Sequence, residues 1–161
     1  MATGDIFLKL DGVKGESKDS THSDQIEVHS FSFGVSNAGS GGAGQGSGTG
    51  KASFGDLHVS KLVDNAGPNL FINCCTGKHH GTATLYVRKS GEKPQEYMTF
   101  SMDEVFISSY QMSGSDGSGL PQESISLNFS KLKYEYKIQN ADGSLGAANP
   151  KTYSVKESKA S

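Results

Sequence analysis

The side chains best suited to chemistry in this sequence are five histidines and two adjacent cysteines. Cys75 precedes His79 by four residues, so a thiolate nucleophile has a possible general base nearby in the sequence. His80 adds a further metal-binding residue type, but neither the C-x-x-C nor the H-x-x-x-H spacing of a ligand set is present. Cys74 and Cys75 follow Phe71 closely, and cysteines in such a segment are more often small core residues. We therefore expect no catalytic residue, no cofactor and no metal, and a cysteine-dependent hydrolase stays as a minor alternative.

A second candidate for chemistry is the glycine-rich stretch at residues 38–50, which reads AGSGGAGQGSGTG. A phosphate-binding loop needs Ser or Thr after Gly50-Lys51, and the chain has Ala52 there. A G-x-G-x-x-G pattern begins at Gly39, but more glycine follows it instead of a helix that could hold a pyrophosphate. No nucleotide site is predicted. The stretch is either a linker or a loop ordered by contacts outside its own subunit.

Length and composition limit the function classes further. The chain has 161 residues, which fits a single domain spanning residues 1–161. Fifteen basic and seventeen acidic side chains give a net charge of −2, and Arg88 is the single arginine. Nucleic-acid binding is therefore disfavoured, because it needs a clustered basic surface. No apolar run approaches the ~20 residues that span a bilayer, and the N-terminus lacks the features of a signal peptide, so we expect synthesis in the cytoplasm and no membrane insertion.

Alternation of apolar and polar residues with a period of two dominates the chain and predicts antiparallel strands. The first contains Ile6, Leu8 and Leu10. Apolar positions change parity near His29 or Ser30, and again between residues 129 and 132, so two long strands should bend, as a closed or strongly coiled barrel requires. The predicted strands are the first one and residues 25–36, 53–63, 82–89, 95–102, 104–112, 125–138 and 152–157.

One segment predicts a helix. Gly67 can serve as its N-cap, Pro68 suits its first position, and Gly77 suits its end. The apolar stripe of this helix contains Leu70, Phe71, Cys74 and Cys75.

Several motifs, in order along nearly the whole chain, resemble the haemolysin-coregulated protein (Hcp) family of bacterial type VI secretion systems. The opening motif is Val13-Lys14-Gly15-Glu16-Ser17, continued by Asp19, His22, Ile26, Val28 and Phe31-Ser32-Phe33-Gly34. The similarity continues through Pro68-Asn69-Leu70, Gly77-Lys78-His79, Val87-Arg88-Lys89, Glu104-Val105-Phe106-Ile107-Ser108-Ser109 and Asn128-Phe129. The resemblance implies a mainly β fold, a compact β-barrel of two antiparallel sheets with one short flanking α-helix, in agreement with the strand pattern.

The same resemblance implies a function in assembly. Six copies would form a ring, and stacked rings would form the inner tube that sheath contraction expels from the cell, so the protein would be secreted without a signal peptide. The implied partners are other copies of the chain, the VgrG spike, the contractile sheath and baseplate proteins, and effector proteins in the lumen. A monomeric ligand-binding β-barrel is the main alternative.

Three sets of site residues follow from the resemblance. Ser30 and Ser32 alternate with Phe31 and Phe33 and would contact effectors in the lumen, although an ordinary outward polar position explains them equally well. The extended loop at the contact between rings would comprise Ala38, Gly39, Ser40, Gly41, Gly42, Gln45, Gly46, Ser47, Gly48, Thr49 and Gly50. A hydrogen-bonded structural loop would contain Gly15, Glu16, Ser17, Asp19 and His22.

Overall fold

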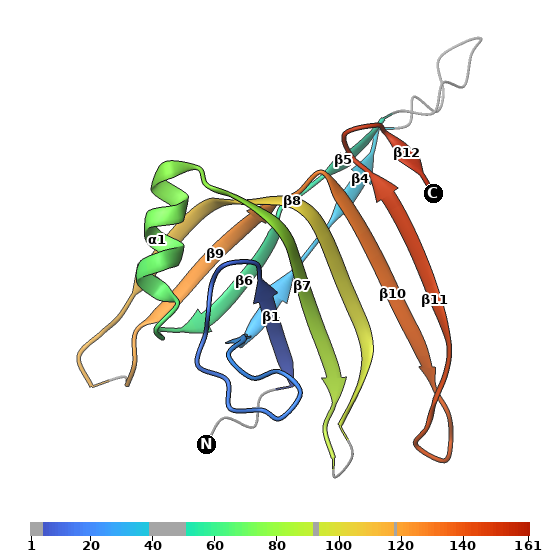
Figure 1. Cartoon of the computed structure of the whole chain (residues 1–161), viewed down its shortest axis with the longest axis horizontal. Coiled ribbons are helices and arrows are strands. Elements are labelled where there is room, and N and C mark those ends of the chain that lie inside the picture. The colour runs from blue at the N-terminus through green and yellow to red at the C-terminus, as the bar shows by residue number, and fades with distance from the viewer. Residues whose placement is uncertain (1–4, 39–50, 92–93, 118) are drawn as a thin grey trace.

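The computed structural model describes residues 5–38, 51–91, 94–117 and 119–161. The fold is mainly β, with antiparallel strands in a ten-stranded and a two-stranded sheet and one helix at the side (Figure 1). The elements are β1 (Ile6–Leu10), β2 (Ile26–Glu27), β3 (Ser30–Ser32), β4 (Val35–Asn37), β5 (Ala52–Phe54), β6 (Leu57–Leu62), α1 (Gly67–Thr76), β7 (His79–Lys89), β8 (Gln95–Ser113), β9 (Gln122–Asn128), β10 (Lys131–Gln139), β11 (Leu145–Ser154) and β12 (Lys159–Ala160).

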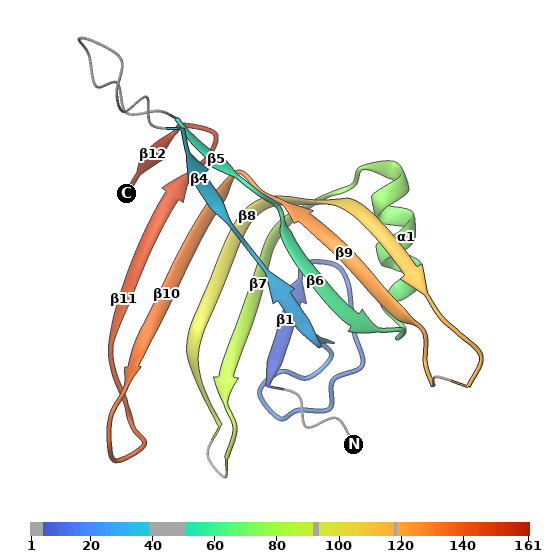
Figure 2. The same ribbon diagram turned by 180° about the vertical axis from the view of Figure 1, so that it is seen from behind.

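The long strand β8 organises the larger sheet because its two halves have different neighbours. It pairs with β7 along one edge, while its first half pairs with β10 and its second half with β9 on the other. One arm of the sheet then runs β10, β11, β12, and the other runs β9, β6, β3. Figures 1 and 2 show the result as two layers, with β7, β10 and β11 on one side and β6 and β9 on the other.

Two predicted bends connect these layers. The chain leaves β2, which pairs with β1, and after a bend at Val28 and His29 enters β3, which pairs with β6. Likewise Phe129 and Ser130 separate β9 from β10. The parity changes in the sequence therefore mark where a strand passes from one layer to the other. Hydrogen-bonded ladders run from β1 through β7, β8, β9 and β6 to β3. Among the described strands no ladder joins β3 back to β1; the bend at Val28 and His29 makes that connection through the chain itself.

Apolar side chains from both layers fill the space between them. Members of this core with at most 2% exposed surface include Leu8, Ile26, Val59, Leu85, Met102, Val105, Ile125 and Leu127. Removing this much apolar surface from water is the main stabilising term of such a fold.

Helix α1 begins and ends close to the predicted residues. Pro68 occupies its first turn, and Gly77 ends it in the left-handed conformation with φ 65°. The N-cap is Ala66 instead of the predicted Gly67. The predicted stripe is only partly buried: Leu70 has no exposed surface, whereas Phe71 is 52% exposed and Cys75 is also exposed.

The strand boundaries differ from the prediction at several places: β7 begins at His79 instead of residue 82, the predicted strand 25–36 is the three strands β2, β3 and β4, and β12 was not predicted. Three further differences concern β8, β5 with β6, and β11. The predicted strands 95–102 and 104–112 are one strand, because the pairing with β7 keeps the same register on both sides of Glu104, which takes a positive φ of 50°. The predicted strand 53–63 is two strands, since Gly55 and Asp56 separate β5 from β6. β11 begins at Leu145, well before the predicted residue 152. The sequence pattern missed the first half of this strand because that half is largely exposed and does not alternate between apolar and polar residues.

Candidate functional site

The outer side of the sheet formed by β3, β6, β9 and the second half of β8 carries a dense set of hydroxyl groups. Two rows of residues cross these four strands in register. One row is Ser30, Ser60, Ser124 and Gln111, and the other is Ser32, His58, Ser126 and Ser109. We call these eight residues the serine wall. They line a groove of about 440 Å³, and among the described residues that line it none is Asp, Glu, Lys or Arg.

The period of two explains why the wall is polar while the sheet is stable. Between the wall residues lie Phe31, Val59 and Ile125, whose side chains point into the core. A β-bulge at Ser108 shifts the register of β8, so that Ser109 pairs with Ser126 and lies in the wall. The predicted lumen residues Ser30 and Ser32 are thus two members of a surface that spans four strands.

Part of the wall is tied together by its own hydrogen bonds. The Ser109 hydroxyl donates to Ser126 Oγ at 2.7 Å, and Ser126 Oγ lies 2.7 Å from His58 Nδ1. Gln122 Nε2 donates to Ser60 Oγ. In contrast, no side-chain hydrogen bond joins the remaining members to any described residue; these are Ser30, Ser32, Ser124 and Gln111.

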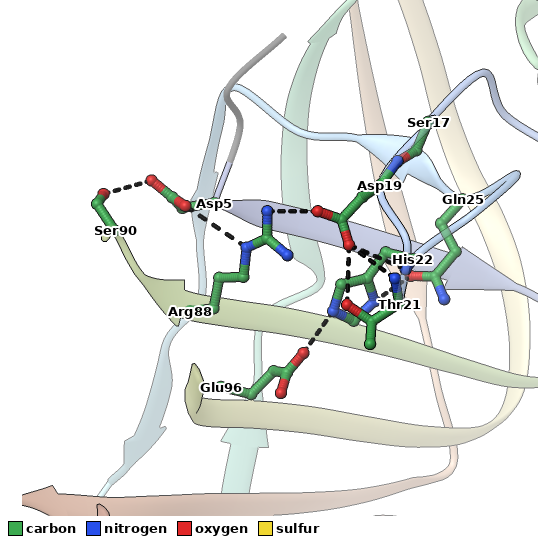
Figure 3. A network of polar contacts seen from close by, with 9 residues as sticks. All are labelled: Asp5, Ser17, Asp19, Thr21, His22, Gln25, Arg88, Ser90 and Glu96. Carbon is green, nitrogen blue, oxygen red and sulfur yellow. Dashed lines mark hydrogen bonds and ion pairs between the residues drawn. The ribbon is translucent and has the colours of Figure 1, made fainter. Parts of the chain in front are cut away.

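A second polar site lies on the other layer, where the loop after β1 folds back (Figure 3). Asp19 is its centre: its carboxylate accepts from the Thr21 amide and hydroxyl, and Arg88 Nη2 lies 2.6 Å from Asp19 Oδ2. The Arg88 guanidinium holds the pKa of the Asp19 carboxyl well below its usual range, and the same contact raises the pKa of Arg88. Arg88 Nε also lies 3.5 Å from Asp5 Oδ1.

His22 lies next to this ion pair and is almost completely buried. Its Nε2 lies 2.5 Å from Glu96 Oε1, and its Nδ1 lies 3.0 Å from Gln25 Oε1 (Figure 3). The imidazole stacks on Phe7, and the Arg88 guanidinium lies over the same Phe7 ring at 4.8 Å from its centroid. The loop is therefore held by charge, hydrogen bonds and ring stacking together.

The other residues predicted for this loop also make defined contacts. Ser17 Oγ accepts from the Asp19 amide, and Glu16 Oε2 accepts from the Asn65 amide at 2.7 Å. Gly15 packs against the backbone of Gln25, where an added Cβ would lie 2.4 Å from the carbonyl oxygen. All five predicted loop residues thus contact backbone or side chains of their surroundings.

A buried ionic cluster beneath α1 was missed by the sequence analysis. Lys61 Nζ lies 2.6 Å from Glu123 Oε1 and 2.7 Å from Asp64 Oδ1, and the Tyr110 hydroxyl donates to Glu123. Burial and the Glu123 carboxylate raise the pKa of Tyr110 to about 12. Gly67 approaches this carboxylate so closely that an added Cβ would lie 2.6 Å from Oε2. The signal was present in the sequence, because Lys61 and Glu123 occupy inward positions of alternating strands.

The candidates for metal or thiolate chemistry are not brought together. Among the described residues no group of three or more His, Cys, Asp or Glu could hold a metal ion. Within the described part of the chain no hydrogen bond joins Cys75 to His79, and the His79 ring packs against Phe106. None of the described helices is long and apolar enough to cross a membrane.

The arms of the glycine-rich loop form the two-stranded sheet. Val35 pairs with Phe54, and Asn37 with Ala52, while Ala38 is exposed at the end of β4. The remaining residues predicted for ring contact, 39–50, lie outside the described residues.

Helix α1 and strand β10 lie at opposite ends of the molecule (Figure 1). In α1, Phe71 and Ile72 are about half exposed. In β10, Tyr134, Tyr136 and Ile138 are 42%, 37% and 61% exposed. Tyr134 stacks on the core residue Phe100 but is itself partly exposed, so apolar surface extends along β10 from the core to the solvent.

Comparisons with known proteins agree with these features. A family model described as "Type VI secretion system effector, Hcp" matches residues 7–136. Protein hcp1 of Pseudomonas aeruginosa is 48% identical over 140 residues, which make up 86% of each chain. A solved structure described as that of a type six secretion system protein has a TM-score of 0.93 at 32% identity, covering 99% of this chain and all of its own. Hcp1 from Salmonella typhimurium has a TM-score of 0.82 at 35% identity, with 98% of each chain covered.

Proposed function

The chain belongs to the Hcp family of type VI secretion proteins, and we propose that six copies form a ring whose channel is lined by the serine wall. Membership makes the protein a structural subunit of the type VI secretion tube, not an enzyme. What we propose beyond family membership is the six-membered ring and the position of the serine wall, which faces its channel. The observation that carries them is the polar, uncharged wall on the outer side of a sheet whose inner side is core.

The wall suits a channel because its chemistry differs from that of an ordinary exposed sheet. Soluble proteins place many charged residues on exposed surfaces, whereas the eight wall residues are six serines, one glutamine and one histidine. Short hydroxyl side chains leave space in a channel and remain compatible with water. Effector proteins carried in the lumen would contact Ser30 and Ser32 as part of this surface.

The two exposed apolar surfaces support contact between neighbouring subunits. A cyclic ring with more than two members requires two different surfaces on each copy, which meet head to tail. Helix α1 and strand β10 lie at opposite ends of the subunit (Figure 2), and both carry exposed apolar side chains. Aromatic side chains such as Phe71, Tyr134 and Tyr136 are typical of buried interface positions.

We assign the stacking of rings to residues 38–50, which connect β4 to β5 in the sequence. Ordering a loop costs about 1–2 kcal/mol per residue, so contact with the next ring should supply the compensating energy. Hydrogen exchange in residues 38–50 should therefore be slower in tubes than in free rings. Equal rates in both would argue against this role.

The remaining assignments follow from the same function. The whole chain, residues 1–161, acts as a single domain, and the loop with Gly15, Glu16, Ser17, Asp19 and His22 maintains the backbone geometry of β1. The protein is made in the cytoplasm and leaves the cell through the type VI apparatus. Its partners there are the VgrG spike, the contractile sheath, the baseplate and effector proteins.

Size-exclusion chromatography with negative-stain microscopy tests the ring directly. The expected species is an annular particle of about 100 kDa, six times the 17.0 kDa chain. A monomer at tens of micromolar without annular particles would instead favour a monomeric ligand-binding barrel.

A further inference from the structure

We infer that contact between subunits at β10 fixes the direction of the two-stranded sheet of β4 and β5, through stacked aromatic rings that connect the two places. We call this pair of strands the small sheet. The inference rests on the proposed function, in which β10 lies in the contact within a ring and residues 38–50, which join the two strands in sequence, lie in the contact between rings. It adds a regulation of that second contact, because ring formation then sets the direction of the strands that lead to it.

The small sheet meets the barrel at a change of strand register. β3 pairs with β6 on one side of this point and β4 with β5 on the other, and the two registers differ by one residue. Gly34 and Gly55 lie at the change, and the Gly55 amide donates to the Gly34 carbonyl oxygen at 2.9 Å. An extra residue on one strand bends and twists a strand pair, and glycine adds backbone freedom. The two glycines therefore form a hinge, beyond which β4 and β5 form a sheet of their own.

Aromatic side chains hold the small sheet against the barrel. Phe33 lies directly before β4 and Phe54 ends β5, and their ring centroids are 6.2 Å apart. Both rings pack against Phe129, with centroid distances of 6.2 and 6.1 Å. Phe54 also packs against Tyr153 of β11 at 5.2 Å, where Figures 1 and 2 both show the small sheet beside the end of β11. We call these four residues the clasp. Turning the small sheet away from the barrel would expose the partly buried rings of Phe33 and Phe54 to water, so the clasp favours one direction of the hinge.

Phe100 connects the clasp to the exposed surface of β10. Its ring centroid lies 5.6 Å from that of Phe33 and 4.9 Å from that of Tyr134, whose ring is stacked on it with 13° between the planes. Tyr134 is 42% exposed, so water reaches the end of this row of rings. A neighbouring subunit that covers Tyr134 excludes this water and holds the ring on Phe100, which strengthens the packing of Phe100 on Phe33. Contact at β10 then favours the closed clasp over the open one and shifts the hinge toward one direction.

Tyr136 offers a matched comparison two residues further along β10. It is 37% exposed, close to the value for Tyr134, but its ring packs against Tyr97 at 6.4 Å. Within the described part of the chain no ring contact joins Tyr136 to Phe100 or to the clasp. The two tyrosines therefore share a surface and differ in their connection to the small sheet.

The test measures hydrogen exchange of the Gly55 amide, because its hydrogen bond to Gly34 crosses the hinge and must break when the hinge opens. The readout is the ratio of the exchange rate in free subunits, obtained by dilution, to the rate in assembled rings of the full chain. We expect a ratio of about five or more for the wild-type protein, since the clasp closes more tightly in the ring. A substitution that only destabilises the fold would raise both rates and leave this ratio unchanged.

Substitutions in β10 separate the coupling from simple burial of the surface. Tyr134→Leu keeps an apolar side chain in the subunit contact but removes the stacked ring, so the ratio should fall to within about twofold of one. Tyr136→Leu changes the same surface without touching the clasp, and Tyr134→Phe retains the stacked ring. Both should keep a ratio of about five or more.

Phe33→Leu tests the same coupling from the clasp, without a change in β10. It removes the ring that links the small sheet to Phe100, so the ratio should again fall to within about twofold of one. This variant decides the question if Tyr134→Leu subunits do not assemble.

The outcomes distinguish this inference from the proposed function. If wild-type rings form but the ratio is near one, or if it stays high in Tyr134→Leu and Phe33→Leu, the inference is wrong while the ring stands. An equal fall in Tyr136→Leu would also overturn it, because burial of the surface alone would then explain the effect. If the wild-type protein forms no rings, the proposed function fails and the inference falls with it.

Discussion

The Lys61 ammonium and the Glu123 carboxylate lie 2.6 Å apart, and neither side chain has any exposed surface. They come from β6 and β9, two of the four strands that carry the serine wall on their other side. The pair therefore joins the wall sheet to the turn before α1, where Asp64 contacts the same ammonium.

Glu123→Gln should destabilise the protein strongly. It removes one of the two carboxylates that pair with the buried Lys61 ammonium, and Asp64 remains, so the expected cost is about 3 kcal/mol in the free energy of unfolding. Urea denaturation measures this value. Lys156→Gln is the matched control, because its ion pair with Glu104 is 3.9 Å long and mostly exposed, so a change under about 0.5 kcal/mol is expected. Similar losses in both variants would contradict the assigned role of burial.

Gly15→Ala should disrupt the loop after β1. The new Cβ would lie 2.4 Å from the Gln25 carbonyl oxygen, and this backbone neighbour cannot rotate away. We expect a loss of at least about 2 kcal/mol in unfolding free energy. Gly34→Ala is the control because open space surrounds its added Cβ, and its change should stay within about 0.5 kcal/mol.

The ion pair of Asp19 with Arg88 should make stability depend on acid pH. The pKa of Asp19 is lowered in the folded state, so the pair stabilises the protein above the unfolded-state pKa of about 3.9 and loses this effect as pH falls through the folded value. Asp19→Asn should cost about 2 kcal/mol at pH 7. Thermal unfolding at pH 7, 5, 4 and 3 should show the difference between the two proteins shrinking below about pH 4. A difference that stays constant down to pH 3 would mean that Asp19 acts without its charge.

Cys75→Ser tests the hydrolase alternative. The side chain is exposed and lies outside the core, so unfolding free energy should change by less than about 0.5 kcal/mol and ring formation should be unchanged. Loss of a measurable hydrolytic turnover in this variant would revive the enzyme hypothesis.

Period-two alternation predicted most strands and both bends, because it reports directly which face of a strand meets the core. It failed where that report is weak. The first half of β11 is largely exposed, so its sequence shows no alternation between buried and exposed positions. At Glu104 the strand continues through a positive φ, which the residue type does not predict. Phe71 was predicted to lie in the apolar stripe of the helix because of its residue type, yet it is half exposed, and Leu70 is the side chain that the helix buries.

The site was predictable in part. Ser30 and Ser32 were found from one strand, but the full wall depends on the pairing of β3 with β6 and of β9 with β8, which no single segment encodes. The ion pair of Asp19 with Arg88 could not be predicted either, because Arg88 lies 69 positions away along the chain.

Electron cryomicroscopy of the assembled particle tests the central claim most directly, because it locates the serine wall relative to the ring axis. We predict a six-membered ring in which Ser30, Ser32 and Ser124 of every subunit face the channel. A ring with these residues on its outer circumference, or particles without a channel, would contradict the account.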